Sequence, residues 1–332
     1  MKKPIRVLVT GGGGDVCRGV VQCLEESQLD LDIFVAGADP HACILYEERR
    51  SFLVPLSASE EYVGTLCNIL NKHSVDVLIP TIDSEILKIS QCRDRIERLT
   101  SARVCVGSND SVSICDDKLL TAKFLEGHGF PYPISYGKNE LTAQGIASLG
   151  YPLIAKSRRG GGSKEIWMIE RESDLEKALC LDDVMIQERL DIEDNEYTAS
   201  VYIGKDLEPK GCCIFKRRLR NGSTIYAERV QDVVIENTVI EIARALNMQF
   251  LNVQGALSKD REFVPFEFNG RFSGTVAVSA RVFNAPELWI RENILGESVG
   301  QSTNQEDFIA FREQQVILIS RTEFEKRSPV IG

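Results

Sequence analysis

The first third of the chain alternates short apolar runs with segments of helical spacing, and this pattern constrains the fold more than any other feature. IRVLVT (5–10) is a near-continuous apolar run, as expected for a strand that is covered on both faces. Four further runs of this kind follow, at 32–39, 50–55, 75–80 and 102–107. Between them, apolar residues recur at helical spacing in segments 15–28, 59–72 and 83–98. Repeated βα units of this length predict a doubly wound parallel sheet with right-handed crossovers.

A second, mixed unit begins near Asp116. DDKLLTAKFLEGHG (116–129) has an acidic start and a glycine stop, which is typical of a helix, and FPYP then acts as a linker. Further helices are expected near 140–148, 172–180 and 232–247. Strands are expected at 152–156, 165–169, 184–188, 195–203, 211–218, 224–230, 251–258 and 262–268.

Length and composition limit the classes of function. A chain of 332 residues is long enough for about two domains. The formal charge of −10 argues against a nucleic-acid surface, so an anionic ligand needs local cationic groups. No apolar run approaches the length of a membrane span, and the apolar start is broken by TGGGGD, unlike a signal peptide. Ten cysteines without a CxxC pair and three isolated histidines predict a cytoplasmic protein with reduced thiols and no zinc cluster.

The first glycine cluster, VTGGGGDVCRG, follows a strand and opens a helix. A dinucleotide pyrophosphate binds at such a helix N-terminus, and Asp39 at the end of the second strand could meet a ribose. The strict GxGxxG pattern fails, however, because Val16 or Cys17 stands where the third glycine belongs. A tight βα turn that needs glycine is the simpler interpretation. An NAD(P)-dependent oxidoreductase or epimerase that uses TGGGG is the alternative.

The second glycine cluster is PLIAKSRRGGGSKEI. An apolar strand delivers Lys156, and two arginines precede three glycines and Ser163. Free backbone N–H groups flanked by cations suit a polyphosphate. This is not a Walker A loop, because no GxxxxGK[ST] leads into a helix. A solvated basic hairpin is the alternative.

FVPFEFNGRFSG (263–274) begins as a buried strand but carries Glu267, Asn269 and Arg271 at every second position. Alternation predicts that these three share one face while Phe266 and Phe268 take the other. A carboxylate and an amide oxygen on one face can both bind Mg²⁺, and an arginine one step further would meet a phosphoryl group.

Four motifs in this order resemble the ATP-grasp superfamily, in particular the carbamoyl-phosphate-synthase-like branch of carboxylate–amine ligases. VLVTGGGG, VAGADP, IPTIDSEIL and DDKLLTAKFL resemble its N-terminal domain and junction, and PLIAKSRRGGGS its lid. MIQERLDIEDNEYT resembles the hinge, and NVQGAL with FVPFEFNGRFSG the metal-binding strands. The implied fold is an N-terminal doubly wound α/β domain (1–115) followed by a two-subdomain ATP-grasp fold. Its lid subdomain would span 116–190, and its C-terminal subdomain, with the metal site, 191–332.

The resemblance also implies a site. ATP phosphates would meet Lys118 and Lys156 together with Gly161, Gly162 and Ser163 of the lid. Adenine would be held through hinge groups of Gln187, Glu188 and Leu190, and the ribose by Glu196. Mg²⁺, or Mn²⁺ in its place, would be bound by Gln254, Glu267 and Asn269. Arg271 would stabilise charge on the transferring phosphoryl group, with Lys156 as its catalytic partner.

The implied activity is that of an ATP-dependent ligase. ATP would phosphorylate a small-molecule carboxylate, an amine would attack the acylphosphate, and ADP and phosphate would leave. The chain has room for one ATP-grasp unit and no GxCxG elbow, so it makes no ammonia from glutamine. Relatives often pair as homodimers through their α/β cores. A non-catalytic nucleotide-binding module is a third alternative.

Overall fold

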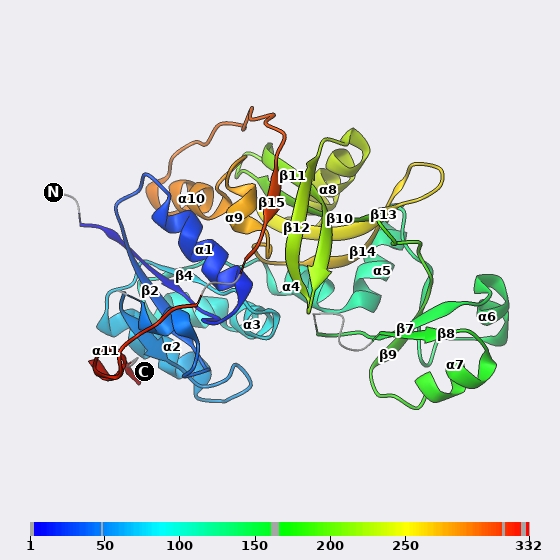
Figure 1. Cartoon of the computed structure of the whole chain (residues 1–332), viewed down its shortest axis with the longest axis horizontal. Coiled ribbons are helices and arrows are strands. Elements are labelled where there is room, and N and C mark those ends of the chain that lie inside the picture. The colour runs from blue at the N-terminus through cyan, green and yellow to red at the C-terminus, as the bar shows by residue number, and fades with distance from the viewer. Residues whose placement is uncertain (1–2, 48, 161–165, 314–315, 327–329, 332) are drawn as a thin grey trace.

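The structure is a computed structural model, and it describes residues 3–47, 49–160, 166–313, 316–326 and 330–331. Three sheets organise these residues: a parallel one built from the N-terminal part, a small four-stranded one, and an antiparallel six-stranded one. Figure 1 shows the small sheet at one end of the molecule, the six-stranded antiparallel sheet in the middle and the parallel sheet at the other end. None of the helices in these ranges is long and apolar enough to cross a bilayer.

The first sheet has the strand order β16-β3-β2-β1-β4-β5, and every neighbouring pair is parallel. Its strands are β1 (Ile5–Val9), β2 (Leu31–Gly37), β3 (Ser51–Leu53), β4 (Val77–Ile79), β5 (Arg103–Val104) and β16 (Val330–Ile331). The intervening helical segments are α1 (Asp15–Glu25), the 3₁₀ turn η1 (Cys43–Tyr46), α2 (Tyr62–Lys72) and α3 (Asp83–Leu99). Strand order reverses between β1 and β4, which is where open α/β sheets bind ligands.

The junction after β5 consists of two helices, α4 (Asn109–Asp116) and α5 (Lys118–Gly127). Asp117 caps α5, since its carboxylate accepts hydrogen bonds from the backbone N–H groups of Leu119 and Leu120. Both helices contact β14 (Phe263–Asn269) of the large antiparallel sheet.

The small sheet has the order β6-β9-β7-β8 and is antiparallel. It consists of β6 (Ser135–Gly137), β7 (Leu153–Ser157), β8 (Ile166–Ile169) and β9 (Val184–Glu188), with α6 (Ala143–Leu149) and α7 (Glu172–Ala178) packed beside it. Its buried side chains form a cluster of their own around Leu153, Ala155 and Ile186. We call this unit the lid sheet.

The large antiparallel sheet has the order β14-β13-β10-β11-β12-β15. Its remaining strands are β10 (Glu196–Ile203), β11 (Pro209–Arg220), β12 (Ser223–Val230), β13 (Phe250–Leu257) and β15 (Ile309–Phe311). Helix α8 (Val233–Ala245) packs on it and is capped by Asp232. The sequence indicated no elements after residue 270, where the structure has α9 (Val276–Ser279), α10 (Ala285–Ile290), the π turn η2 (Arg291–Leu295) and α11 (Arg321–Lys326).

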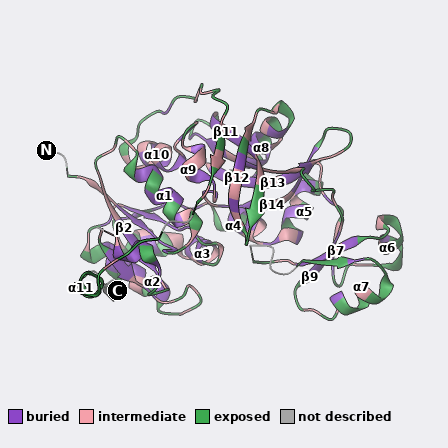
Figure 2. Cartoon of the chain, viewed as in Figure 1, coloured by how far each residue is buried: buried purple, intermediate pink, exposed green. Residues whose placement is uncertain are grey.

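One continuous core joins the parallel sheet to the large antiparallel sheet. Val20 and Leu24 of α1 share a buried cluster with Phe250, Phe272 and Trp289. Gly19 permits this contact, because a Cβ at that position would lie 2.8 Å from Val276. Figure 2 shows buried residues throughout both of these sheets, whereas α6 and α7 present exposed residues outward. The doubly wound parallel sheet predicted for the N-terminal part is confirmed, and two antiparallel sheets follow it.

Candidate functional site

A cavity of about 310 Å³ lies between the lid sheet and the large antiparallel sheet. Both sheets contribute walls to it, from β7, β8 and β9 on one side and from β10, β11, β13 and β14 on the other. Eight of the residues singled out from the sequence line it: Lys118, Lys156, Gln187, Glu188, Leu190, Glu196, Gln254 and Glu267. The fold therefore collects residues that are up to 149 positions apart in the chain around one ligand-sized space.

Strand register explains why Gln254 and Glu267 meet. β13 and β14 are antiparallel, and these two residues are directly paired, so their side chains leave the same face of the sheet. The register shifts immediately afterwards, between Gln254 and Gly255. Phe266 lies on the cavity side as well, with the Lys156 ammonium 5.8 Å from its ring centre. The expectation that Phe266 and Phe268 share the opposite face is thus wrong for Phe266, because the bulge locally breaks the alternation, while Phe268 is buried in the core.

Lys156 is almost completely buried, with 7% of its surface exposed. Burial in this wall lowers the pKa of its ammonium to about 8; Glu267 opposes that fall and Lys118 adds to it. A buried, only partly compensated cation at the end of β7 is suited to a polyanion that would restore its charge balance.

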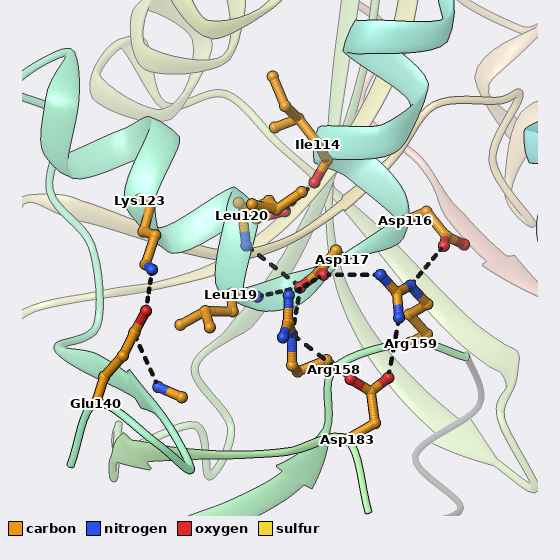
Figure 3. Close-up of polar contacts among 12 residues, drawn as sticks. Ile114, Asp116, Asp117, Leu119, Leu120, Lys123, Glu140, Arg158, Arg159 and Asp183 are labelled. Carbon is orange, nitrogen blue, oxygen red and sulfur yellow. Dashed lines mark hydrogen bonds and ion pairs between the residues drawn. The ribbon is translucent and has the colours of Figure 1, made fainter.

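The loop after β7 is fastened to the α4–α5 junction by ion pairs, which Figure 3 shows converging on Asp117. Arg158 pairs with the Asp117 carboxylate at 2.5 Å, and Arg159 reaches Asp116 at 3.7 Å and Asp183 at 3.3 Å. Although burial alone would raise it, the pKa of the Asp117 carboxyl is lowered by the hydrogen bond and charge of Arg158.

Lys118 follows Asp117 directly and is placed by the same contacts. Its backbone N–H donates to the Arg158 carbonyl at 2.9 Å, and its ammonium donates to the Gly160 carbonyl at 2.6 Å. Lys118, Lys156, Arg159 and Arg217 line the same cavity, so four cationic side chains surround it despite the acidic chain.

Part of the cavity lining is apolar, which suits a base. Ile154, Ile166, Leu190, Ile192 and Leu219 form this part, and several of these side chains remain partly exposed. The Gln187 and Glu188 side chains are turned toward the neighbouring segment, since Gln187 donates to the Ser135 hydroxyl and Glu188 accepts from the Ile134 N–H. Because these side chains are bonded elsewhere, Gln187 and Glu188 would contact a base only through backbone atoms and as part of the cavity wall.

Arg217 on β11 belongs to this site, although the sequence did not single it out. Its guanidinium donates to the Glu196 carboxylate at 2.9 Å and 2.5 Å and to the Gln254 side-chain oxygen at 2.7 Å. It therefore connects the residue assigned to the ribose with one assigned to the metal. The available signal was the alternation in KRRLR, which places Arg217 and Leu219 on one face of the strand.

The three residues assigned to a metal lie in neighbouring spaces. Glu267 lines both the large cavity and a small crevice of about 30 Å³, and Asn269 lines the crevice. Within the part of the chain that the structure describes, the buried Asn269 amide nitrogen has no hydrogen-bond partner, whereas the amide of Asn252, its neighbour on β13, donates to Thr198 and to the Ala199 carbonyl. An unsatisfied buried amide beside a carboxylate fits a site completed by a ligand. Among the described residues, no three His, Cys, Asp or Glu side chains are grouped as a metal site.

Arg271 lies away from the cavity. It follows the end of β14, and its guanidinium pairs with both oxygens of Asp83, at 2.6 Å and 3.1 Å. The sequence placed Arg271 on the same face as Glu267 and Asn269, but the strand ends at Asn269 and the chain turns toward α3. Gly161, Gly162 and Ser163 lie outside the described residues.

The first glycine cluster has a packing role at each of its close contacts. A Cβ on Gly11 would lie 2.4 Å from the Thr81 hydroxyl, and a Cβ on Gly37 would lie 2.8 Å from the Gly12 carbonyl. Gly13 has a φ of +112°, which other residues rarely adopt. At the start of α1, Asp15 pairs with Arg312 and places a carboxylate where a pyrophosphate would bind. These contacts favour the tight-turn interpretation over a dinucleotide site.

Comparison with known proteins agrees with this geometry. Residues 115–275 match the family model described as an ATP-grasp domain, and residues 7–102 match the model described as a PylC-like N-terminal domain. The cavity and every residue that lines it fall within the first of these segments. No curated protein sequence matches the chain.

Several solved structures have a similar fold. N5-carboxyaminoimidazole synthetase from Staphylococcus aureus, complexed with ADP, has a TM-score of 0.73 and 17% identity over 94% of this chain and 81% of that one. An L-amino acid ligase from Bacillus licheniformis has a TM-score of 0.65 and 14% identity, over 88% and 74%. Biotin carboxylase from Campylobacter jejuni, in an ATP complex, has a TM-score of 0.67 and 16% identity, over 86% and 70%.

The fold and the cavity define a protein of the ATP-grasp type, in which two antiparallel sheets enclose a nucleotide-sized space. The chain carries an ATP-grasp domain over residues 115–275 and an N-terminal domain of the PylC-like kind over residues 7–102. The prediction of the ATP-grasp fold is confirmed.

Proposed function

We propose that the protein is an ATP-dependent carboxylate–amine ligase that works through an acylphosphate and converts ATP to ADP and phosphate. The observation that carries the proposal is the single cavity in which Lys118, Lys156, Gln254 and Glu267 meet beside an apolar slot. It combines a place for a base, a carboxylate near the expected sugar and a cationic end for phosphates.

Each part of the nucleotide has a counterpart in the cavity. The apolar walls around Leu190 and Leu219 suit adenine, and Glu196 suits the ribose hydroxyls. Arg217 holds Glu196 in place, so the carboxylate is oriented before the nucleotide arrives. Lys118 and Lys156 supply positive charge for the phosphates, and bound phosphates would raise the pKa of Lys156 back toward its ordinary value.

Glu267 and Asn269, with Gln254, would hold Mg²⁺ through oxygen atoms, the ligands that this ion prefers. The direct pairing of Gln254 with Glu267 on one face of the sheet supports this assignment. A bound Mg²⁺ would neutralise phosphate charge during phosphoryl transfer. Mn²⁺ would be accommodated by the same oxygen ligands.

The chemistry follows from the weakness of a carboxylate as an electrophile. A carboxylate oxygen attacks the γ-phosphorus of ATP, the bond to the bridging oxygen breaks, and ADP leaves. The amine nitrogen then attacks the carbonyl carbon, loses a proton, and expels phosphate that retains one carboxylate oxygen. Two anions must approach in the first step, and the ammonium groups of Lys118 and Lys156 offset their repulsion.

The test is a screen for phosphate release with MgATP over pairs of small carboxylates and amines. ADP and phosphate should form only when both partners of a productive pair are present, and the Glu267→Gln variant should be inactive with that pair. If the protein binds MgATP but releases phosphate with none of the pairs tested, the non-catalytic alternative is favoured. Binding of NADH in place of MgATP would favour the oxidoreductase alternative.

A further inference from the structure

Each of the three guanidinium nitrogens of Arg271 donates a hydrogen bond in this structure. Its Nε and Nη2 atoms donate to the two Asp83 carboxylate oxygens, and its Nη1 donates to the Phe272 carbonyl at 3.2 Å. It is not among the residues that line the nucleotide cavity. An arginine held in this way can meet a transferring phosphoryl group only after it leaves Asp83.

Asp83 comes from a different domain and occupies a position suited to substrate binding. It is the first residue of α3 and follows β4, at the edge of the parallel sheet where strand order reverses between β1 and β4. Its side chain is 38% exposed, whereas that of Arg271 is 16% exposed. A ligand arriving from solvent can therefore reach the carboxylate more readily than the guanidinium.

The surroundings of Asp83 favour a cation. The small crevice beside it is also lined by Asp116, Glu267 and Asn269, and Lys118 is its only cationic wall among the described residues. Burial, and next the negative charge of Asp83, raise the pKa of the Asp116 carboxyl. An anionic second substrate would meet three carboxylates there.

We propose that Asp83 holds Arg271 away from the phosphoryl group until the ammonium group of the amine substrate pairs with Asp83 and frees Arg271. Asp83 is then a positioning residue that also selects the substrate class, namely an amine that binds as a primary ammonium ion and loses one proton to solvent before its nitrogen attacks the acylphosphate. This inference rests on the proposed ligase function and deepens it.

Charge balance explains why the exchange would depend on the amine. If Arg271 leaves and no cation replaces it, Asp83 remains unpaired beside Asp116. An uncompensated carboxylate in a partly buried place raises the free energy of the protein. When an ammonium group replaces the guanidinium, Asp83 stays paired and Arg271 becomes available for phosphoryl charge. Phosphoryl transfer is thereby coupled to the presence of the amine. The acylphosphate does not form when the amine is absent and water would be the only nucleophile.

The test compares the wild type with Asp83→Asn and with Asp116→Asn, a matched variant that removes one charge from the same crevice but keeps the Asp83–Arg271 pair. The probe is MgADP with aluminium fluoride, which mimics the transferring phosphoryl group, and its dissociation constant is measured by calorimetry. Asp83→Asn should bind the mimic about tenfold more tightly than the wild type, within the usual range of coupling between sites. Asp116→Asn should show no such gain, and binding of MgADP alone should be the same in all three proteins.

Two further measurements test whether Arg271 and an ammonium ion account for the gain in affinity. The gain should vanish in the double variant Asp83→Asn/Arg271→Ala, because no guanidinium is then released. Methylammonium chloride should tighten binding of the mimic by the wild type and leave Asp83→Asn unchanged, with sodium chloride at equal ionic strength as the control. Equal binding of the mimic by the wild type and Asp83→Asn, with MgADP binding intact, would overturn the role of Asp83. Absence of any methylammonium effect on the wild type would overturn the ammonium assignment, and failure of the wild type to bind MgADP would overturn the proposed function itself.

Discussion

Replacing Lys156 with methionine should stabilise the empty protein while removing its affinity for nucleotide. Burial holds the pKa of Lys156 at about 8 instead of 10.5. This difference corresponds to about 3 kcal/mol in the free energy of unfolding, since a tenfold change in an ionisation constant is worth about 1.4 kcal/mol. Methionine is of similar length, fills the space beside Phe266 and carries no charge to bury.

The sign of the pH dependence follows from the two pKa values. Below pH 8 the ammonium is charged in the folded and unfolded states, so the full cost of burying it is present. As the pH rises from about 8 toward 10.5, only the unfolded state keeps the proton, and the cost disappears. Lys156→Met should therefore exceed the wild type by up to about 3 kcal/mol near pH 7 and by about half of that or less near pH 9.5.

Urea unfolding followed by tryptophan fluorescence measures this difference, because Trp167 lies in the lid sheet and Trp289 in the shared core. Lys177→Met is the matched control: Lys177 is 79% exposed on α7 of the same unit, and its replacement should give no pH-dependent gain. MgADP should stabilise the control and the wild type but not Lys156→Met. A Lys156→Met protein that is less stable than the wild type near pH 7, or whose advantage is independent of pH, would refute this account of Lys156.

Three further predictions concern the cavity. Glu267→Gln should lower turnover about 100-fold or more while leaving thermal stability near that of the wild type, because it removes the only carboxylate of the proposed metal set; unchanged turnover in a coupled phosphate assay would remove Glu267 from the mechanism. Arg217→Ala should lower the free energy of unfolding, measured with urea, by about 1–3 kcal/mol, because Glu196 and Gln254 lose their shared donor. Arg218→Ala, whose partner Asp194 is exposed, should lower it much less. Equal losses in the two variants would show that the contact of Arg217 with Glu196 and Gln254 adds no stability. Saturating MgATP should raise the free energy of unfolding by about 3 kcal/mol at a hundredfold excess over its dissociation constant, and MgGTP by less, because the hinge around residues 187–190 would read adenine through backbone groups; equal protection by the two nucleotides in thermal unfolding would contradict the hinge assignment.

Much of this architecture is visible in the sequence because it depends on local patterns. The parallel strands are short apolar runs such as Val7–Val9, and helix starts such as Asp117 and Asp232 carry their own capping side chains. The segments after residue 270 were not foreseen. Their helices are only four to six residues long, and their positions depend on contacts with α1, which lies more than 250 residues earlier.

The same difference between local patterns and contacts of distant residues applies to the site. Residues on neighbouring strands, such as Gln254 and Glu267, could be associated from motif order, and the structure pairs them directly. Arg217 was overlooked because its role depends on two partners from different strands, which no single-strand pattern reveals. Phe266 and Arg271 were misplaced because a bulge and a strand end interrupt the alternation on which the prediction relied. The metal, nucleotide and catalytic assignments stay predictions.

The acylphosphate is the central claim, and an isotope measurement tests it most directly. Once the screen identifies a carboxylate substrate, its carboxyl group is labelled with heavy oxygen and the released phosphate is analysed by mass spectrometry. One labelled oxygen should appear in the phosphate, with ADP as the other product, because the amine expels phosphate together with the oxygen that bridged carbon and phosphorus. Phosphate free of label, or AMP in place of ADP, would contradict the account.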